Sequence, residues 1–272
     1  MRRTSVTLIA LLLAAATAAC GGGKASREPA AAPSGTTAAQ SSQAPTQTSR
    51  APTQASTLPH GGEPVHLDPA RFTARIDNPW WPMTPGNRWV YRETDAQGNQ
   101  QRIEVTVTNQ TKRILGIDAR VVHDVATTNG QVQEDTYDWY AQDDRGNVWY
   151  MGEDTKEYQN GKVTSTEGSW QAGVDGAQPG ILIPAHPKPG MAYRQEYYKG
   201  QAEDGAQVLS LGRRAKVPYG VFGNLVITKE FTPLEPGVVE HKFYAPGVGQ
   251  VLAVTVSGGS SREELVEFRH AP

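Results

Sequence analysis

The sequence has little of several features that usually point to a function. It contains a single cysteine, Cys20, among 272 residues, so it cannot form an intramolecular disulfide. Its 26 basic and 28 acidic residues nearly balance, with a formal net charge of −2, and they are mixed along the chain, with no polybasic membrane patch after residue 3. Because nucleic-acid binding needs a basic surface that neutralises phosphates, we expect no nucleic-acid partner.

Signature motifs of catalysis and cofactor binding are missing as well. The chain has no G-x-S-x-G nucleophile elbow, no Walker loop and no G-x-G-x-x-G fingerprint. No HxH, HExxH or CxxC spacing indicates a zinc centre. The sequence therefore predicts no catalytic residue, no metal and no cofactor, and it favours a protein that is not an enzyme without settling the question.

The one long apolar run stands at the N-terminus. "MRR" precedes an apolar stretch at residues 6–19, which is shorter than the roughly 20 residues that a membrane-spanning helix needs. A charged start, an apolar middle and a small-residue end are typical of an export signal. We therefore expect residues 1–19 to be a signal peptide.

The run ends in "TAAC-GGG" at Cys20, which resembles a bacterial lipobox. Thr17 departs from the Leu or Val that usually lies three residues before the lipobox cysteine. The resemblance implies that Cys20 receives a diacylglyceryl group and becomes the new N-terminus, so that a lipid anchor holds the protein on the extracytoplasmic face of the cell membrane. The alternatives are an ordinary signal peptide with a coincidental cysteine, or a lone buried cysteine. Two or three acyl chains suffice for stable anchoring.

The next segment, residues 20–64, is rich in Ala, Pro, Ser, Thr, Gln and Gly and has no aromatic residue. Such a composition cannot bury enough apolar surface to offset the entropy of ordering the chain. It predicts a disordered tether between the anchor and a folded domain at residues 65–272.

The remaining sequence is dominated by β-strand patterns. In "RIEVTVTN", Ile103, Val105 and Val107 alternate with polar residues, and similar runs recur to the C-terminus, separated by turn signals such as "TNGQ", "DRGN" and "QNGK". Residues 167–190 are so rich in Gly and Pro that they predict a long loop. The fold class expected is all-β: a single domain with a large curved antiparallel sheet, a half-barrel or open barrel.

A hairpin crowded with aromatic and acidic residues, "YDWYAQDDRGNVWYMGEDT", starts at residue 137. Alternation places Tyr137 and Trp139 on one face, and Trp149 lies on the outgoing strand. "DDRG" has the chemistry of a four-residue turn, which "DAQG" repeats at residues 95–98. The sharper alternative is a calcium site, whose oxygen donors would be Asp143, Asp144, Asn147, Glu153 and Asp154.

Two other clusters are candidate ligand contacts. Trp80 and Trp81 lie between two prolines on a stiff backbone. One of them could close the end of the sheet, and the other could stack on a sugar or an apolar ligand. His123 shares a face with Val121 and Val125, and His241 shares one with Val239 and Phe243. Those faces are expected to point to the core, where the histidines would be satisfied core residues or part of an acid–base site.

Segments such as "DWYAQDDRGNVWYMGEDTKEY" and "YAPGVGQV" resemble those of a group of uncharacterised bacterial exported proteins and lipoproteins. The pattern is also similar to the half-barrels of lipoprotein carriers, whose concave face holds acyl chains. The resemblance favours a non-catalytic binding or envelope-interaction lipoprotein with an apolar or lipid, glycan or protein ligand. The alternatives are a hydrolase that uses carboxylates of the 134–157 hairpin with His123 or His241, and a structural envelope spacer. The oligomeric state stays open.

Overall fold

The strands of this protein form one continuous antiparallel sheet. The computed structural model describes residues 58–271, and Cys20, the expected signal peptide and most of the expected tether lie outside them. A short 3-10 helix, η1 (Pro69–Arg71), precedes the strands. The sixteen strands are β1 (Phe72–Thr73), β2 (Arg88–Thr94), β3 (Gln100–Ile114), β4 (Ile117–Thr128), β5 (Gln131–Asp143), β6 (Val148–Gln159), β7 (Lys162–Ser165), β8 (Trp170–Gln171), β9 (Gln178–Ile183), β10 (Ala192–Arg194), β11 (Glu196–Tyr197), β12 (Gly205–Val217), β13 (Gly220–Phe231), β14 (Val239–Ala245), β15 (Gly249–Ser257) and β16 (Arg262–Arg269).

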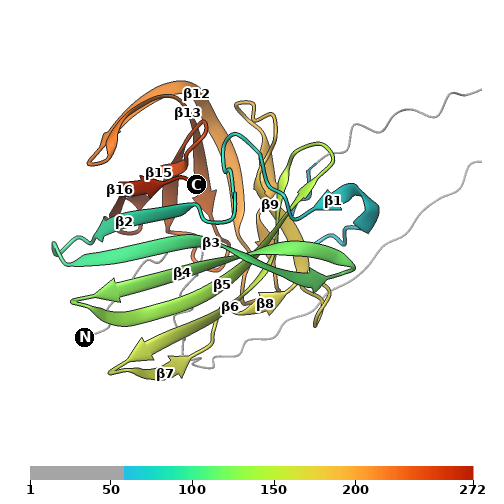
Figure 1. Ribbon diagram of the computed structural model, residues 1–272, viewed down its shortest axis with the longest axis horizontal. Coiled ribbons are helices and arrows are strands. Elements are labelled where there is room, and N and C mark those ends of the chain that lie inside the picture. The colour runs from blue at the N-terminus through green and yellow to red at the C-terminus, as the bar shows by residue number, and fades with distance from the viewer. Residues whose placement is uncertain (1–57, 272) are drawn as a thin grey trace, which may run out of the picture. The chain divides into compact units, whose positions relative to one another are not determined.

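The sheet nearly closes on itself as a barrel (Figure 1). Its strand order is β10-β12-β13-β14-β15-β16-β2-β3-β4-β5-β6-β9-β11, with β1, β7 and β8 attached to β5 and β6. The two ends of this order, β10 and β11, are consecutive in the chain and are joined through Gln195. The predicted all-β domain with a large curved antiparallel sheet is therefore confirmed.

The hairpins turn where the sequence supplies residues that tolerate a positive φ. Asn129 and Gly130 have φ angles of 52° and 76° between β4 and β5, and Asn160 and Gly161 have 52° and 74° between β6 and β7. Two successive positive φ angles define the type I′ turn, which matches the twist of antiparallel strands and favours Asn-Gly. These turns are the "TNGQ" and "QNGK" signals of the sequence.

The long loop predicted for residues 167–190 is wrong in part, because this segment contains β8 and β9. β9 pairs with β6 on one side and with β11 on the other, so it is needed to close the barrel. Ile181, Leu182 and Ile183 are all buried. A short apolar run between Gly and Pro residues is consistent with a strand buried on both faces, and the flanking turn residues hid it.

The barrel interior is apolar towards one end of the barrel and polar towards the other. Trp81 stacks on Trp89 and packs against Tyr244, with ring centroids 6.2 and 5.6 Å apart. Four residues after Trp89 along β2, Glu93 points to the same face and is paired with Glu263 of β16. The aromatic residues thus fill one end of the barrel, and acidic residues line the other.

The first described residues pack against the domain ahead of position 65. The Arg194 guanidinium donates hydrogen bonds to the carbonyl oxygens of Gly61, Glu63 and Pro179, and the Arg194 backbone N–H donates to Pro59. Within residues 58–271, no helix has the length and apolar character that would let it cross a membrane.

Candidate binding site in the barrel interior

Acidic side chains from many strands meet inside the barrel. Cross-strand neighbours share a face of the sheet; Tyr91 pairs with Ile103, Ile103 with Ala126, and Ala126 with Glu134. The same inward face carries carboxylates on strands that are far apart in the sheet order, and we call this set the acidic interior. Its buried members are Glu93, Asp124, Glu134, Asp138, Glu153, Glu196, Glu230 and Glu263, and the less buried Asp204 and Glu240 adjoin them.

Burial raises the pKa values of eight of these acids. Loss of hydration raises the pKa of Glu93, Asp138 and Asp204 to about 7. The pKa values of Asp124, Glu153, Glu196 and Glu263 are raised well above the usual range, first by burial and then by repulsion from neighbouring acids. Members of the set are therefore protonated at neutral pH, because a buried carboxylate without a cation is costly.

Only two cationic side chains are buried among the described residues, Lys242 and Arg194. Lys242 Nζ lies 2.6 Å from Glu230 Oε2 and 3.6 Å from Glu240 Oε2. Burial lowers the Lys242 pKa, but these carboxylates outweigh that effect and raise it above its usual value. The Arg194 guanidinium donates hydrogen bonds to the backbone carbonyl oxygens of Gly61 and Glu63 rather than to an acid. The acidic interior thus holds far more carboxyl groups than cations.

Neutral donors satisfy several of the acids. The Tyr150 hydroxyl donates to Asp138 Oδ1 at 2.7 Å, and Trp170 Nε1 donates to Glu196 Oε2 at 2.7 Å. Within the described part of the chain, however, Glu153 Oε2, Asp204 Oδ1 and the Tyr193 hydroxyl are buried without a hydrogen-bond partner. Since buried polar atoms are rarely left unpaired, these three atoms mark the places where a ligand could bond.

The two candidate histidines do not belong to this site. The inward residues of β4 are Val122, Asp124 and Ala126, because they pair through β3 with the inward face of β2. His123 therefore points outward, where its Nε2 lies 2.8 Å from Asp135 Oδ1. His241 also lies on the outer face, opposite Lys229. The expectation of core-facing histidines is wrong, because their neighbours in the chain, Asp124 on β4 and Lys242 on β14, are on the face that points into the barrel.

Three predicted aromatic contacts share the outer face of β5 and β6. Tyr137 stacks on His123 at 4.3 Å, and Trp139 is buried beneath Lys112, whose Nζ lies 3.2 Å from the ring centroid. Trp149 packs edge-on against Phe72. The predicted separation of the two faces is confirmed, since Asp138 and Tyr140 point inward. All three rings therefore contact side chains of the protein itself.

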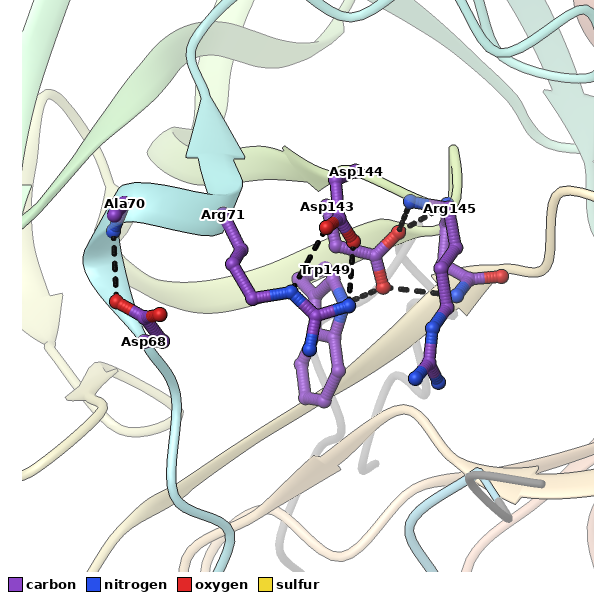
Figure 2. Close-up of polar contacts among 8 residues, drawn as sticks. Asp68, Ala70, Arg71, Asp143, Asp144, Arg145 and Trp149 are labelled. Atoms are coloured by element: carbon purple, nitrogen blue, oxygen red, sulfur yellow. Dashed lines mark hydrogen bonds and ion pairs between the residues drawn. The ribbon is translucent and has the colours of Figure 1, made fainter. Parts of the chain in front are cut away.

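The acidic turn between β5 and β6 is built around Asp143 (Figure 2). Its carboxylate accepts hydrogen bonds from the backbone N–H groups of Arg145 and Asn147, and from Trp149 Nε1 at 2.9 Å. Asp144 makes a two-pronged ion pair with Arg71 of η1, with both distances 2.8 Å. Asp95 bonds the N–H groups of Gln97 and Asn99 in the same way, so the repeated turn is a structural device.

The oxygen donors of the calcium alternative do not converge. Asp143 holds the turn, Glu153 points into the barrel, and Asp154 lies outside beside Lys156. In the described residues, no group of three or more His, Cys, Asp or Glu side chains is arranged to hold a metal ion.

The two adjacent tryptophans diverge as the sequence predicts. Trp81 is buried in the aromatic end of the barrel. Trp80 is half-buried and lines an open surface pocket of about 510 Å³ together with Asn78, Gln142 and His186. Trp80 thus faces a surface pocket, whereas Trp81 closes the end of the barrel.

Comparison with known proteins identifies two distant structural relatives. No family model and no curated protein matches the chain. A predicted exported protein with a YmcC-like fold from Bacteroides fragilis is 14% identical, with 70% of this chain and 99% of that one covered and a TM-score of 0.41. A predicted lipoprotein from Parabacteroides distasonis is 13% identical, with 71% and 99% covered and a TM-score of 0.38. These similarities are too distant to assign a function.

Sequence reasoning identified part of the 134–157 hairpin but missed the acidic interior as a set. The signal was present in "EDTYDWY", where Glu134, Thr136, Asp138 and Tyr140 alternate with the other face. A strand face that carries acids is normally assigned to solvent. Here that face points inward because the sheet curves round into a nearly closed barrel.

Proposed function

We propose that this protein is a lipid-anchored, extracytoplasmic binding protein whose acidic interior binds a positively charged organic group, an amine or a guanidinium. The observation that carries the proposal is the excess of buried carboxyl groups over cations, with Glu153 Oε2 and the Tyr193 hydroxyl unpartnered. The anchor is supported by the lipobox-like "TAAC-GGG" around Cys20.

A cation with several N–H donors suits this chemistry better than an apolar ligand. Buried carboxylates gain most from charge-assisted hydrogen bonds, which are stronger than neutral ones. Tyr140, Tyr150 and Trp170 form a continuous aromatic cluster next to Asp138 and Glu196, and aromatic faces attract desolvated cations. An acyl chain or a neutral glycan would instead leave the acids uncompensated.

Binding of a cation would release protons. The interior acids have raised pKa values, and a bound positive charge lowers the pKa of a neighbouring carboxyl group. Affinity for the cation should therefore increase between pH 5.5 and pH 8. Lys242 already occupies the part of the site next to Glu230 and Glu240 and also acts on Asp204, so the ligand would take the part near Glu153 and Asp138.

The hydrolase and spacer alternatives have less support. The hydrolase required a histidine among the carboxylates of the hairpin, and His123 and His241 point to the outer face. A spacer has no need of an interior in which burying carboxyl groups costs stability.

Binding is tested with spermidine and arginine methyl ester as probes, by calorimetry and thermal melting at pH 8. Sodium chloride at matched ionic strength is the control for screening. We expect a rise in melting temperature beyond that of the salt and a weaker effect at pH 5.5. Glu153→Gln should reduce the effect, whereas Asp154→Asn, one residue away on the outer face, should not. Equal effects of probe and salt would refute the cation site.

The anchor is tested separately by labelling cells with radioactive palmitate. The wild-type chain should incorporate label and partition with membranes, and Cys20→Ala should lose both properties. An unlabelled wild-type chain would reject lipidation and leave the interior site untouched.

A further inference from the structure

The β12–β13 hairpin extends well beyond its pairing with the rest of the sheet. β12 pairs with β10 only at Gly205 to Gln207, and β13 pairs with β14 only from Val226 onward. Its far end is nevertheless held, because the Tyr219 N–H donates to Leu265 O at 3.1 Å and the Tyr219 hydroxyl donates to Phe268 O at 3.3 Å. In Figure 1 the hairpin, drawn in orange, arches past β15 and β16. The hairpin is therefore attached to the domain at both of its ends.

The hairpin carries many of the exposed apolar side chains of the described domain. Ten large hydrophobic residues are exposed, and five of them lie on this hairpin. The five are Leu209, Leu211, Tyr219, Val221 and Phe231. Scattered exposed apolar residues are normal, but their concentration on one hairpin indicates an interaction surface.

The hairpin is also positively charged, although the chain as a whole carries −2. Residues 205–229 contain Arg213, Arg214, Lys216 and Lys229 and no Asp or Glu. Arg213, Arg214 and Lys216 are exposed, and none of them forms an ion pair within the described residues. The expectation that charges are evenly mixed along the chain is therefore wrong in this segment.

The exposed edge of β12 is poorly suited to accept a strand from another protein. The β12–β13 pairing has three register shifts, between Val208 and Ser210, Ser210 and Arg213, and Arg213 and Ala215. Bulges and exposed basic side chains are the devices by which edge strands avoid pairing with other chains. Basic residues beside exposed apolar ones instead fit the boundary between lipid headgroups and acyl chains.

We infer that the exposed end of the β12–β13 hairpin, residues 209–221, docks on an anionic lipid bilayer. Leu209, Leu211 and Val221 enter the headgroup region, and Arg213, Arg214 and Lys216 contact lipid phosphates. Basic side chains near an anionic surface each add favourable electrostatic energy that salt screens. This surface is separate from the acidic interior, and its binding needs neither a ligand there nor the acyl chain on Cys20.

The test uses the chain from residue 20 onward with Cys20→Ala, so that no acyl chain contributes. Its binding to vesicles of phosphatidylcholine containing 30% phosphatidylglycerol is measured by co-sedimentation at about 0.1 M salt. We expect binding that disappears with pure phosphatidylcholine and weakens strongly at about 0.5 M salt. The triple variant Arg213→Ser, Arg214→Ser and Lys216→Ser should bind at least tenfold more weakly.

A matched variant removes the same charge elsewhere, with Lys162→Ser, Lys188→Ser and Lys199→Ser, all at exposed positions. It should keep most of the vesicle binding. Leu209→Ser with Leu211→Ser should weaken binding while preserving the salt dependence. Circular dichroism melting confirms that each variant is folded.

Three outcomes would overturn the inference. These are wild-type binding that is equal on neutral and anionic vesicles, no binding at all, and equal losses in the two charge variants. Self-association that the two Leu substitutions abolish, without vesicle binding, would assign the surface to a second copy of the chain instead.

Discussion

Lys242 Nζ lies 2.6 Å from Glu230 Oε2 inside the barrel, and the two side chains are only 7% and 9% exposed. Glu230 also accepts hydrogen bonds from the hydroxyls of Thr228 and Tyr244. The Lys242 charge also acts on Asp204, whereas no cation is among the groups that shift the pKa of Glu153 or Asp138. The pair therefore compensates one part of the acidic interior and leaves the part around Glu153 and Asp138 without a cation.

Replacing Lys242 should therefore be strongly destabilising. In Lys242→Met, Glu230 and Glu240 lose their buried partner, and breaking a buried ion pair in this way costs about 3–5 kcal/mol. Lys229→Met is the matched control, since Lys229 is the partner of His241 on the outer face and contacts the Phe231 ring; it should cost less than about 1 kcal/mol. Urea denaturation at pH 7 compares the two, and equal losses would contradict the assigned role.

Stability should fall as the pH rises through neutrality. Glu93, Asp138 and Asp204 have folded-state pKa values raised to about 7, so the folded state binds more protons than the unfolded state above about pH 4.5. The stabilisation is complete below the unfolded-state pKa values and is lost as the pH passes the folded-state values. One such group accounts for on the order of 3 kcal/mol. Denaturant unfolding at pH 5.5 and pH 8 measures the loss; a constant or rising stability would be inconsistent with a desolvated acidic interior.

Gly180 should be essential for barrel closure. A methyl group at this position would overlap the backbone carbonyl of Gln195, where the chain passes from β10 to β11. Gly180→Ala should destabilise the domain by about 1–3 kcal/mol or more. Gly220→Ala, where a Cβ meets no atom within 4 Å, should be neutral or slightly stabilising. Thermal melting of both variants checks this difference, and similar melting temperatures would argue against the steric role.

The two related turns should differ in their sensitivity to loss of aspartate. Asp143→Ala removes backbone hydrogen bonds and also leaves Trp149 Nε1 without its acceptor. Asp95→Ala removes the corresponding bonds to Gln97 and Asn99 but exposes no tryptophan donor. We expect a loss of about 2 kcal/mol for Asp143→Ala and about 1 kcal/mol for Asp95→Ala. Thermal melting checks this, since Asp143→Ala should have the lower melting temperature, and the reverse order would contradict the role assigned to Trp149 Nε1.

Local patterns in the sequence were enough to predict the fold class, the hairpin turns and the separation of faces on individual strands. Period-two alternation in "RIEVTVTN" and the Asn-Gly pairs at 129–130 and 160–161 are local signals, so they need no knowledge of distant residues. The divergence of Trp80 and Trp81 is likewise a local property of an extended backbone between prolines.

Which face of each strand lies inside the barrel depends on contacts between distant parts of the chain. Alternation places Asp124 and His123 on opposite faces of one strand, and Asp138 and Tyr137 on opposite faces of the next. It does not say which of the two faces becomes the inside of the barrel. That depends on β10 and β11 meeting beside β9, a relationship between distant segments. Closure removes the acids of β2, β4, β5, β6, β13 and β16 from water together, and this shared loss of hydration turns ordinary carboxylates into a candidate binding site.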